Sequence, residues 1–590
     1  MSTFVESTPQ HRRQMNFLLS MSGLGGLLYG IDLGIIAGAL PYLEATSGFT
    51  SNQLSVVVAA VLLGSVGSTL FAGLLSDAWG RRPVMIVSGF AFILSVPMMA
   101  LSSSFFTLVL GRLFQGISAG LVGVVVPLYL AECLGATNRG KGTGVFQWLI
   151  TLGIFTAALV AWLFSFRVEA IEQLQDAQRL FDFKNLAWRS IFWISLIPGL
   201  AFTVGSFFTS ESPRWLFRQG RRAEAKAVLM KTRPEAQAES ELQEMEALQG
   251  APSKVEAQRE SIFRRKYMIP FALACAILMG TQATGINSII GYNTTLLIQS
   301  GLSDHDAHLG YVLMTLVNFL MTWIGVSLVD RLGRKFLLTV GASGLTLCLL
   351  VIGFLFDRVE SKRLDGQAYV QSLVNSDQEL HFDFTGAKAD TLVQKINPNR
   401  QDLLGKPSTA VLIYAYGDFR AASKVVRSQD PLAQIHVTRA NVVPTNRVVA
   451  FFSSPFGDWE AGQRAPLKIE HALLTPTPSS SNGWATAILI FLFIGFFALG
   501  PGVCVWLALS ELMPTRIRSN GMSVALLLNQ AVSTLIALLF LPSVGQYGYG
   551  PVFFVFAGFS IVFTLIAAFW LPETKGKTLE EIETQFDPTP

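Results

Sequence analysis

Charged residues are scarce in this sequence. They make up 14% of the 590 residues, whereas hydrophobic residues make up 51%, and the mean hydropathy is +0.46. Typical soluble domains carry about a quarter charged residues, so an ordinary soluble protein is excluded. The formal net charge of +4 reflects a bias of basic residues in loops rather than a basic surface, so we expect no nucleic-acid partner.

Cysteine and histidine are also few, with four and six residues. The cysteines (Cys133, Cys275, Cys348 and Cys504) lie in or beside apolar runs, so the sequence predicts neither a disulfide framework nor a metal site. The polar segments contain no nucleophile elbow, phosphate-binding loop or cluster of metal ligands. We therefore expect a protein that is not an enzyme and that has no catalytic residues and no cofactor.

Apolar runs of about 20 residues, the length that crosses a bilayer as a helix, recur about twelve times between residues 17–43 and 551–571. Segments that cross lipid must be helical, because lipid satisfies no backbone polar group. The first run is longer than a signal-peptide core and lacks a cleavage pattern, so we expect it to be retained. The predicted fold class is an all-α membrane protein with twelve transmembrane helices.

Lysine and arginine predict the orientation. If the N-terminus is cytoplasmic, the short loops and tails on that side carry about 25 of these residues, against about four on the other side, as the positive-inside rule requires. We expect both termini in the cytoplasm. The expected location is a bacterial cytoplasmic (inner) membrane, although a eukaryotic origin stays open.

Two short motifs occur twice and in the same order. The first is an aspartate followed three residues later by glycine and two bases, and the second is a glutamate with an arginine seven residues later. The copies of the first are 77–82 and 330–335, and those of the second are 132–139 and 511–518. Duplicated halves are typical of transporters, so the sequence predicts two six-helix halves.

The spacing of these copies locates an insertion. The copies of the first motif are 253 residues apart and those of the second are 379 apart, so about 126 extra residues lie between helices 9 and 10. They form the polar stretch 357–483. Strand-like segments at 410–416 and 447–452 predict a small β-containing domain outside the membrane, with a disordered loop as the alternative.

The expected organisation follows from these boundaries. It comprises an N-terminal six-helix half (1–209), a cytoplasmic linker with short helices (210–267), helices 7 to 9 (268–356), the extracytoplasmic insertion (357–483), helices 10 to 12 (484–571) and a cytoplasmic tail (572–590).

Two ionisable residues lie far from the ends of their predicted helices, namely Asp32 in helix 1 and Arg112 in helix 4. A charge at the bilayer centre costs a few kcal/mol or more, so each should face the bundle interior and approach the other. A pair that forms and breaks during a conformational cycle takes up and releases a proton. The two residues are therefore candidates for proton coupling, with a static structural pair as the alternative.

Six motifs together resemble the sugar porter family of the major facilitator superfamily, including its bacterial sugar/proton symporters. The motifs are GLLSDAWGRR (73–82), PLYLAECLGATNRG (127–140), ESPRWL (211–216), QATGIN (282–287), VDRLGRK (329–335) and PETKG (572–576). The resemblance implies the major facilitator fold, and the position of Asp32 implies a proton symporter. The proton gradient would then be the energy source.

The resemblance also implies a latch of charged residues at the cytoplasmic face, which joins the halves in one state and separates in another. Ordinary solvated loop charges are the alternative. The implied members are Asp77, Arg81, Arg82, Glu132, Arg139, Glu211, Arg214, Asp330, Arg334, Lys335, Glu511 and Arg518.

The substrate-binding residues that the resemblance implies are Gln147, Gln282, Asn287, Tyr292, Asn318, Trp506 and Asn529. Amides donate and accept hydrogen bonds, as vicinal hydroxyls require, and an indole offers an apolar face to a sugar ring. The set carries no charge, which favours a small neutral sugar or polyol. On an ideal helix Gln282 and Asn287 would lie about 140° apart, so we expect Thr284 and Gly285 to distort helix 7.

Four positions depart from the family pattern, namely Thr281, Gly291, Gln530 and Ser210. The family usually has glutamine, tyrosine, tryptophan and proline there. We expect these differences to make the binding cavity wider and more hydrated, so the identity of the sugar is not predicted. The favoured function is proton-coupled symport of a neutral sugar by alternating access. The alternatives are a facilitator without proton coupling and a sugar receptor that uses the outer domain.

Overall fold

The computed structural model describes residues 9–134, 136–250, 265–400, 404–430, 433–444, 447, 457–513, 518–575, 581–582 and 585–586. Twelve helices in these ranges are long and apolar enough to cross a membrane. The structure also contains strands, which lie in the insertion. The predicted fold class is confirmed.

The N-terminal half contains the first six spans. Its helices are α1 (Pro9–Ser47), α2 (Ser51–Trp79), α3 (Arg81–Ala100), α4 (Phe105–Cys133), α5 (Ala136–Glu172), and α6 (Ala177–Ile194) with α7 (Leu196–Phe208), which together form the sixth span. Polar caps begin several of them. Thr50 and Gln53 form a capping box at the start of α2, which satisfies backbone donors that a helix leaves free at this end.

The linker between the halves forms three short helices, α8 (Pro213–Arg218), α9 (Arg222–Leu229) and α10 (Glu235–Gly250). Leu216, Leu229 and Leu242 are buried in a small apolar cluster that joins the three helices. They have a small core of their own beside the membrane bundle.

The C-terminal half contains the other six spans. Its helices are α11 (Arg265–Ala283), α12 (Ile286–Gly291), α13 (Asn293–Gln299), α14 (Asp304–Leu332), α15 (Arg334–Glu360), α20 (Ser480–Leu499), α21 (Pro501–Leu512), α22 (Arg518–Tyr547), α23 (Tyr549–Leu565) and the π-helical turn η4 (Ile566–Trp570).

Helix 7 is discontinuous, as predicted. Gly285 separates α11 from α12 in a left-handed conformation with φ of +79°, which side chains with a Cβ rarely adopt. A Cβ at this position would also lie 2.5 Å from the ring of Phe556. The break therefore requires glycine for two reasons, and it rotates α12 relative to α11.

The insertion folds as a β-containing domain. Its elements are β1 (Leu364–Asp365), α16 (Gln367–Gln371), β2 (Leu380–Asp383), α17 (Gly386–Ile396), β3 (Ser408–Tyr416), β4 (Phe419–Ala422), β5 (Val426–Arg427), β6 (Gln434–Val437), η3 (Arg439–Asn441), α19 (Trp459–Arg464) and β7 (Leu467–Pro476). The main sheet has the order β1-β7-β3-β4, with β5 beside β3, and β2 pairs with β6; all pairs are antiparallel.

The predicted strand 410–416 is confirmed by β3, whereas most of the predicted strand 447–452 lies outside the described residues. The insertion is slightly shorter at both ends than the predicted 357–483. Helix α15 continues to Glu360 and α20 begins at Ser480, because the polar ends of these helices project beyond the apolar core of the spans.

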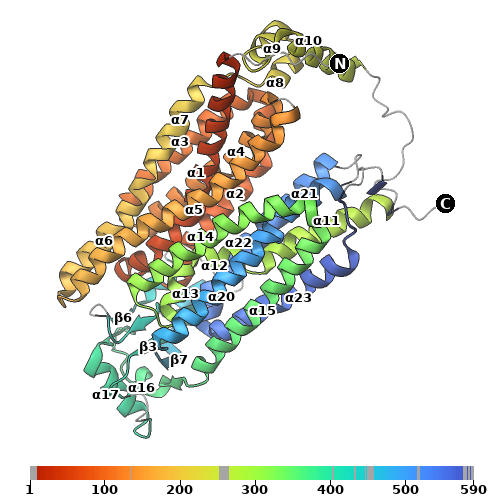
Figure 1. The fold of residues 1–590 in the computed structure, drawn as a ribbon. Helices are drawn as coiled ribbons and strands as arrows, with labels where there is room; N and C mark the ends of the chain where they lie inside the picture. Colours follow the sequence, from red (N-terminus) through yellow and green to blue (C-terminus); the bar gives the residue numbers. More distant parts are fainter. Residues whose placement is uncertain are drawn as a thin grey trace.

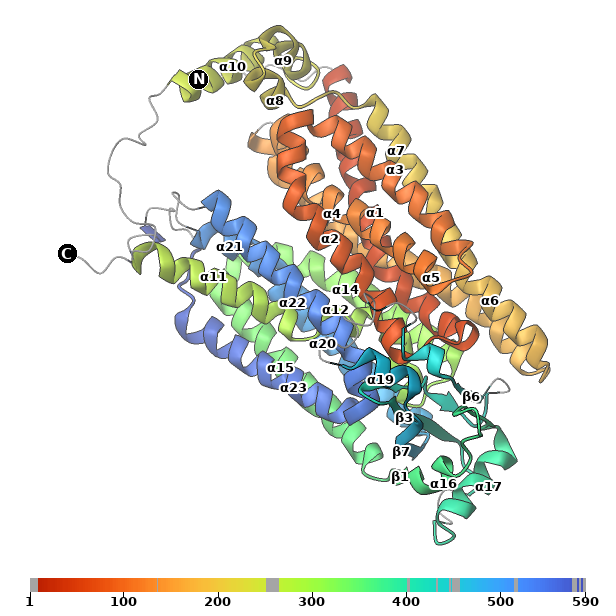
Figure 2. The ribbon, with the colours of Figure 1, turned by 180° about the vertical axis from the view of Figure 1, so that it is seen from behind.

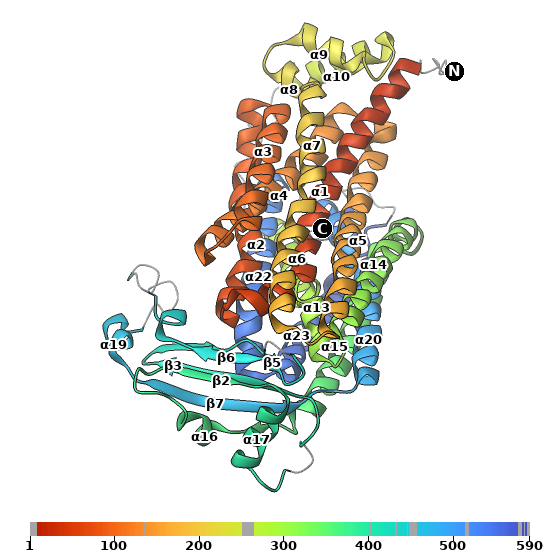
Figure 3. The same cartoon turned by 90° about the vertical axis from the view of Figure 1, so that its left-hand side faces the viewer.

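The two halves converge at one end of the molecule and diverge toward the other (Figures 1 and 2). The sheet of the insertion lies across the converging end, which we term the insertion face, and α8 to α10 lie at the opposite end, which we term the linker face (Figure 3). Side-chain hydrogen bonds join α14 to α1 and α5 near the insertion face. Tyr42 donates to Asp304 and Tyr311 donates to the carbonyl of Gly34. His308 contacts the carbonyl of Gly38, and His305 contacts Ser165. The structure is therefore closed at the insertion face.

Candidate transport site

Asp32 and Arg112 lie in one buried cluster between α1 and α4, and each side chain is 1% exposed. The guanidinium donates from Nη1 to Oε1 of Gln115 at 2.6 Å and from Nε to the carbonyl of Val57 at 3.4 Å. Among the described residues, neither Asp32 oxygen accepts a hydrogen bond of standard geometry, although Arg112 and the Gln115 amide both interact with this carboxylate electrostatically. The predicted neighbours are thus brought together, but not into direct ion-pair contact.

Gln115 was missing from the residues singled out in the sequence. It lies between the two charges, because its Oε1 accepts from Arg112 and its amide interacts with the Asp32 carboxylate. Its position one turn after Arg112 on α4 could have identified it from the sequence, since residues three apart share a helix face. The three side chains form a buried acid, amide and base that can rearrange without a covalent change.

A second polar cluster forms at the break in helix 7. Asn287 of α12 donates to Oε1 of Gln282 at 3.0 Å and to Oγ of Ser533 at 2.7 Å, and Gln282 donates to Oδ1 of Asn529 at 3.3 Å. Asn529 in turn donates to the carbonyl of Leu278 at 2.9 Å. The rotation at Gly285 brings together two amides that an unbroken helix would separate.

Ser533 belongs to this cluster but was not among the binding residues predicted from the sequence. It lies four residues after Asn529 on α22, so its spacing placed it on the same helix face. In the interactions described, the amide and hydroxyl groups of this cluster form hydrogen bonds only with each other and with the backbone. Each of these groups can also form a hydrogen bond with a hydroxylated ligand in place of its present partner.

The remaining predicted binding residues lie on neighbouring helices. Tyr292 is buried, donates to the carbonyl of Ala537 at 3.3 Å and stacks on Phe540 at 4.9 Å between ring centroids. Gln147 is half-buried on α5 and Asn318 is buried on α14. Next to them, Trp148 stacks on Phe319 at 4.9 Å and joins the two helices. The side chain of Trp506 lies outside the described part of the structure.

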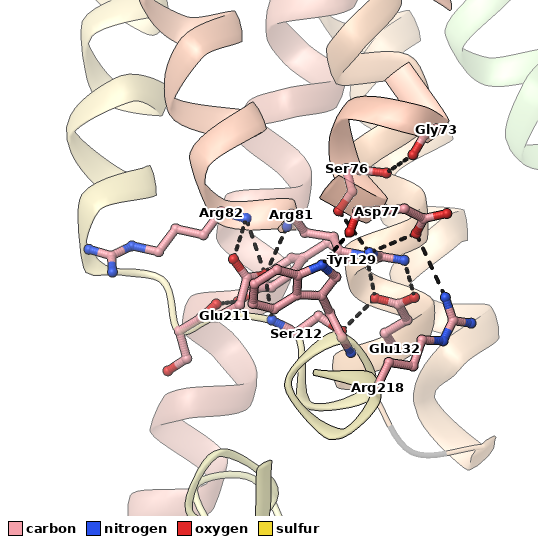
Figure 4. Close-up of polar contacts among 12 residues, drawn as sticks. Gly73, Ser76, Asp77, Arg81, Arg82, Tyr129, Glu132, Glu211, Ser212 and Arg218 are labelled. Carbon is pink, nitrogen blue, oxygen red and sulfur yellow. Dashed lines mark hydrogen bonds and ion pairs between the residues drawn. The ribbon is translucent and has the colours of Figure 1, made fainter. Parts of the chain in front are cut away.

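The charged residues of the linker face form one cluster in each half. In the N-terminal half, Arg81 is 2% exposed and binds both oxygens of Glu132 at 2.8 Å and Asp77 at 3.0 Å (Figure 4). Glu211 accepts from the backbone nitrogens of Arg81 at 2.8 Å and Ser212 at 2.7 Å. This carboxylate therefore caps the N-terminus of α3, where helix dipoles favour negative charge.

The C-terminal half repeats this arrangement. Arg334 binds Glu511 at 3.2 Å, and Glu573 accepts from the backbone nitrogens of Arg334 at 3.0 Å and Lys335 at 3.2 Å. Thr574 donates to Glu511, as Ser212 does to Glu132. Glu573 is thus the counterpart of Glu211. The sequence contained this signal, because an acid followed by a hydroxyl residue comes after the last helix of each half.

The structure differs from the predicted latch between halves. The ion pairs described for Arg81, Glu132, Arg334 and Glu511 each join residues of the same half, because the halves diverge at the linker face (Figure 2). Arg214 is exposed. The side chains of Arg139, Asp330 and Arg518 lie outside the described residues. A latch between the halves stays a prediction for another conformation.

Arg81→Ala should destabilise the protein strongly. Removing one partner of a buried ion pair costs about 3–5 kcal/mol, since the other charge stays buried, and Glu132 is 7% exposed. Arg82→Ala is the matched control, because the neighbouring guanidinium donates to the exposed carbonyl of Phe207. Melting curves in detergent should show a large loss for the first variant and little change for the second. Equal melting temperatures would contradict the structural role of Arg81.

The insertion contacts both halves. Ser51 at the start of α2 donates to the carbonyl of Ser423 at 3.0 Å, and Asn52 donates to that of Arg420 at 3.4 Å. On the other side, Arg427 donates to the carbonyl of Leu302, before α14, at 3.3 Å. The domain is covalently part of the C-terminal half, so it bridges the two halves at the insertion face.

Comparisons with known proteins agree with this architecture. The sequence profile of the family described as "Sugar (and other) transporter" matches residues 18–372 and 467–586, and so spans the membrane part on both sides of the insertion. The human "Proton myo-inositol cotransporter" is 26% identical over 579 residues, which cover 96% of this chain and 81% of that protein. The "Glucose transporter GlcP" of Staphylococcus epidermidis is 25% identical over 566 residues, covering 95% of each chain.

A solved structure has the same fold. The xylose transporter XylE from E. coli, in a partially occluded inward-open conformation, superimposes with a TM-score of 0.63 at 19% identity, over 96% of this chain and 99% of that chain. Together with the twelve spans and the family match over most of the sequence, these comparisons show that the chain belongs to the sugar porter family and is a multi-pass membrane transporter of the major facilitator fold, not an enzyme.

Proposed function

We propose that the protein is a proton-coupled symporter of a small neutral sugar or polyol that works by alternating access. The observation that carries the proposal is Asp32, a carboxyl group buried inside the bundle without a direct ion pair among the described residues. Buried intramembrane acids mark proton pathways. The names of the relatives, which include a proton myo-inositol cotransporter, support the same reading.

The two polar clusters have different roles. Asp32 binds the proton, and Arg112 and Gln115 provide the electrostatic environment of its carboxylate. The amide and hydroxyl cluster at the break in helix 7 binds the substrate, since discontinuous helices commonly form transport sites. The set carries no charge, which fits a neutral ligand, and the proton gradient supplies the energy without a cofactor.

The proposed orientation places the linker face in the cytoplasm and the insertion outside. The linker and adjoining loops carry the basic residues, as cytoplasmic segments do. The structure, which is closed at the insertion face, then corresponds to an inward-facing state. In this state the protein releases the substrate and the proton into the cytoplasm. A bacterial inner membrane is the proposed location.

The test is direct. Purified protein in liposomes should alkalinise the external medium when one member of a panel of hexoses, pentoses and inositols is added, because symport carries protons inward with the substrate. The same measurement identifies the substrate. Counterflow of a sugar without any pH change would make the protein a facilitator and reject proton coupling.

Asn287→Ala should weaken substrate binding. The variant removes an amide that bonds Gln282 and Ser533 in this state and that, in the proposed site, bonds hydroxyl groups of the substrate. Each such neutral hydrogen bond contributes about 0.5–1.5 kcal/mol, so we expect the half-saturating concentration in counterflow to rise about fivefold. Thr534→Ala is the control, because this neighbouring hydroxyl bonds the backbone of its own helix at Gln530. An unchanged half-saturating concentration in Asn287→Ala would remove Asn287 from the site.

Deletion of the insertion should leave measurable transport, because the proton and substrate clusters lie outside it. The deletion should remove residues 364–478 and keep Glu360, whose carboxylate accepts from the backbone nitrogens of Tyr549 at 2.7 Å and Gly550 at 3.1 Å. A short Gly and Ser bridge replaces the deleted segment. Complete loss of counterflow by a deletion protein with an unchanged melting temperature would show that the insertion is needed for transport itself.

A further inference from the structure

We propose that His308 is a second proton-binding residue, which as an imidazolium joins the halves at the insertion face and makes the opening of that face depend on pH. The residue lies one turn into α14 and is 0% exposed. Its ring stacks on Tyr42 of α1, with centroids 5.1 Å apart and an interplanar angle of 13°. It therefore lies between the two halves.

Both ring nitrogens of His308 face carbonyl oxygens. Nδ1 lies 2.8 Å from the carbonyl oxygen of Asp304, and Nε2 lies 3.1 Å from that of Gly38 on α1. A carbonyl oxygen only accepts, and a neutral imidazole donates from one nitrogen only. The doubly protonated ring is the one form that satisfies both contacts, so this geometry selects the imidazolium.

The surrounding charges favour the cation. The Asp304 carboxylate lies 3.6 Å from Nδ1 and accepts from the Tyr42 hydroxyl at 3.0 Å. The other ionisable groups on the elements around it are of both signs. They are Glu44 on α1, Glu172 on α5, Lys184 on α6, Lys424, Arg427 and Asp430 in the insertion, and His305 and Asp306 on α14 itself. Burial lowers the pKa of Arg427 only to about 10, so it stays charged.

A route for the proton is present. Asp304 lines a cavity of about 540 Å³ between the insertion and the bundle, together with Glu172 and Asp430. Its carboxylate lies between this cavity and the buried ring of His308. A proton from the cavity thus reaches His308 by way of Asp304, without passing Asp32.

Proton binding at His308 is linked to conformation. Opening the insertion face separates α14 from α1, which breaks the contacts of His308 with Gly38 and of Tyr311 with Gly34, the latter at 2.8 Å. In the open state water replaces the Gly38 carbonyl, and the ring no longer needs its second proton. The ring therefore holds a proton more tightly in the closed state, so low pH favours closure and rising pH favours opening.

The role differs from that proposed for Asp32. In the interactions described, His308 contacts neither the Asp32 cluster nor the substrate cluster, so it acts as a positioning residue that biases the closed state. One proton linked to one conformational change shifts the ratio of closed to open molecules by at most about tenfold per pH unit. Only the statement that His308 responds to the pH outside the cell rests on the proposed function, which places the insertion face outside.

The test is a distance measurement that needs no transport. Spin labels at Leu174→Cys and Arg358→Cys, which are exposed on the two halves at the insertion face, report opening in lipid nanodiscs without substrate; the four native cysteines are buried. We expect the long-distance population to grow as the pH rises from about 5 to 8. His308→Gln should remove this dependence and favour the open state.

The controls separate the proposal from its alternatives. His305→Gln should keep the pH dependence. The Ser165 hydroxyl donates to the carbonyl of Trp162 at 2.7 Å and accepts from Nδ1 of His305 at 3.0 Å, so one ring proton satisfies this contact. Asp32→Asn should keep it too. Loss of the dependence in Asp32→Asn, or its persistence in His308→Gln, would overturn the proposal.

A second measurement covers the case in which His308→Gln does not fold. Nitrogen-15 NMR of histidine-labelled wild-type protein distinguishes doubly protonated rings from neutral ones. We expect one doubly protonated histidine at a pH at which the spin labels report the closed state. Spectra in which all six histidines are neutral at that pH would reject the imidazolium. Neither readout depends on whether a sugar is transported.

Discussion

Asp32→Asn should abolish uphill accumulation of sugar and leave counterflow intact. Asparagine has almost the same shape as aspartate but does not titrate, so it fits the buried position beside Gln115 and mimics the protonated state. A symporter with one proton per sugar accumulates up to about tenfold per unit of pH gradient, and the variant should equilibrate at a ratio of about one.

Liposomes with an imposed pH gradient measure this ratio directly. Asp182→Asn is the matched control, because this acid is exposed on α6 and accepts from Gln178 at 3.1 Å. It should accumulate sugar as the wild type does. Undiminished accumulation by Asp32→Asn would show that the coupling proton binds elsewhere, and His308 would then be the first residue to examine.

Cross-linking the insertion to the N-terminal half should stop transport. A short thiol-reactive cross-linker between Asn52→Cys and Arg420→Cys would fix the contact in which the Asn52 amide donates to the Arg420 carbonyl at 3.4 Å. The insertion belongs covalently to the C-terminal half, so the bridge prevents the halves from separating at this face. Rocking of the halves is required for alternating access, and we expect transport to fall more than tenfold on cross-linking.

A second cysteine pair controls for modification itself. Lys362→Cys and Arg400→Cys occupy a similar contact, from the Arg400 guanidinium to the Lys362 carbonyl at 2.9 Å, but both lie on the same side of the interface. Cross-linking this pair should leave transport unchanged. Transport that survives the first cross-link would mean that the insertion moves with the N-terminal half, and the assignment of the rigid bodies would have to change.

The contacts of the insertion explain why fixing it and removing it should differ. It bridges the halves through a few hydrogen bonds near Ser51 and Asn52, and the conformational change breaks these easily. A covalent bond in the same place cannot break. Deletion removes the bridge altogether, and the closed state then depends on the contacts between α1 and α14.

The sequence predicted much of the candidate site because its signals are local. The helix break followed from two amides on incompatible faces and a glycine between them, and the structure confirms it at Gly285. Other members were missed because no motif marks them. Gln115 and Ser533 are ordinary polar residues whose role depends on neighbours from α1 and α12.

For the predicted latch, the sequence located the charged residues but did not determine how they pair. The sequence placed the charges at one face, but pairing depends on which helices meet there in a given state. In this state Arg81 pairs with Glu132 and Arg334 pairs with Glu511, each inside its half. Pairing within halves and pairing between halves use the same residues, so residue identity alone did not distinguish them.

The amino-acid sequence by itself determined the twelve spans, the duplicated halves, the insertion and the buried charges, because lipid imposes length, helicity and polarity on each segment separately. The tertiary structure alone decided which face is closed, that Gln115 lies between Asp32 and Arg112, and that both nitrogens of His308 meet carbonyl oxygens. These features arise where helices far apart in the chain pack together, and the free energy of such packing depends on partners that no local pattern encodes.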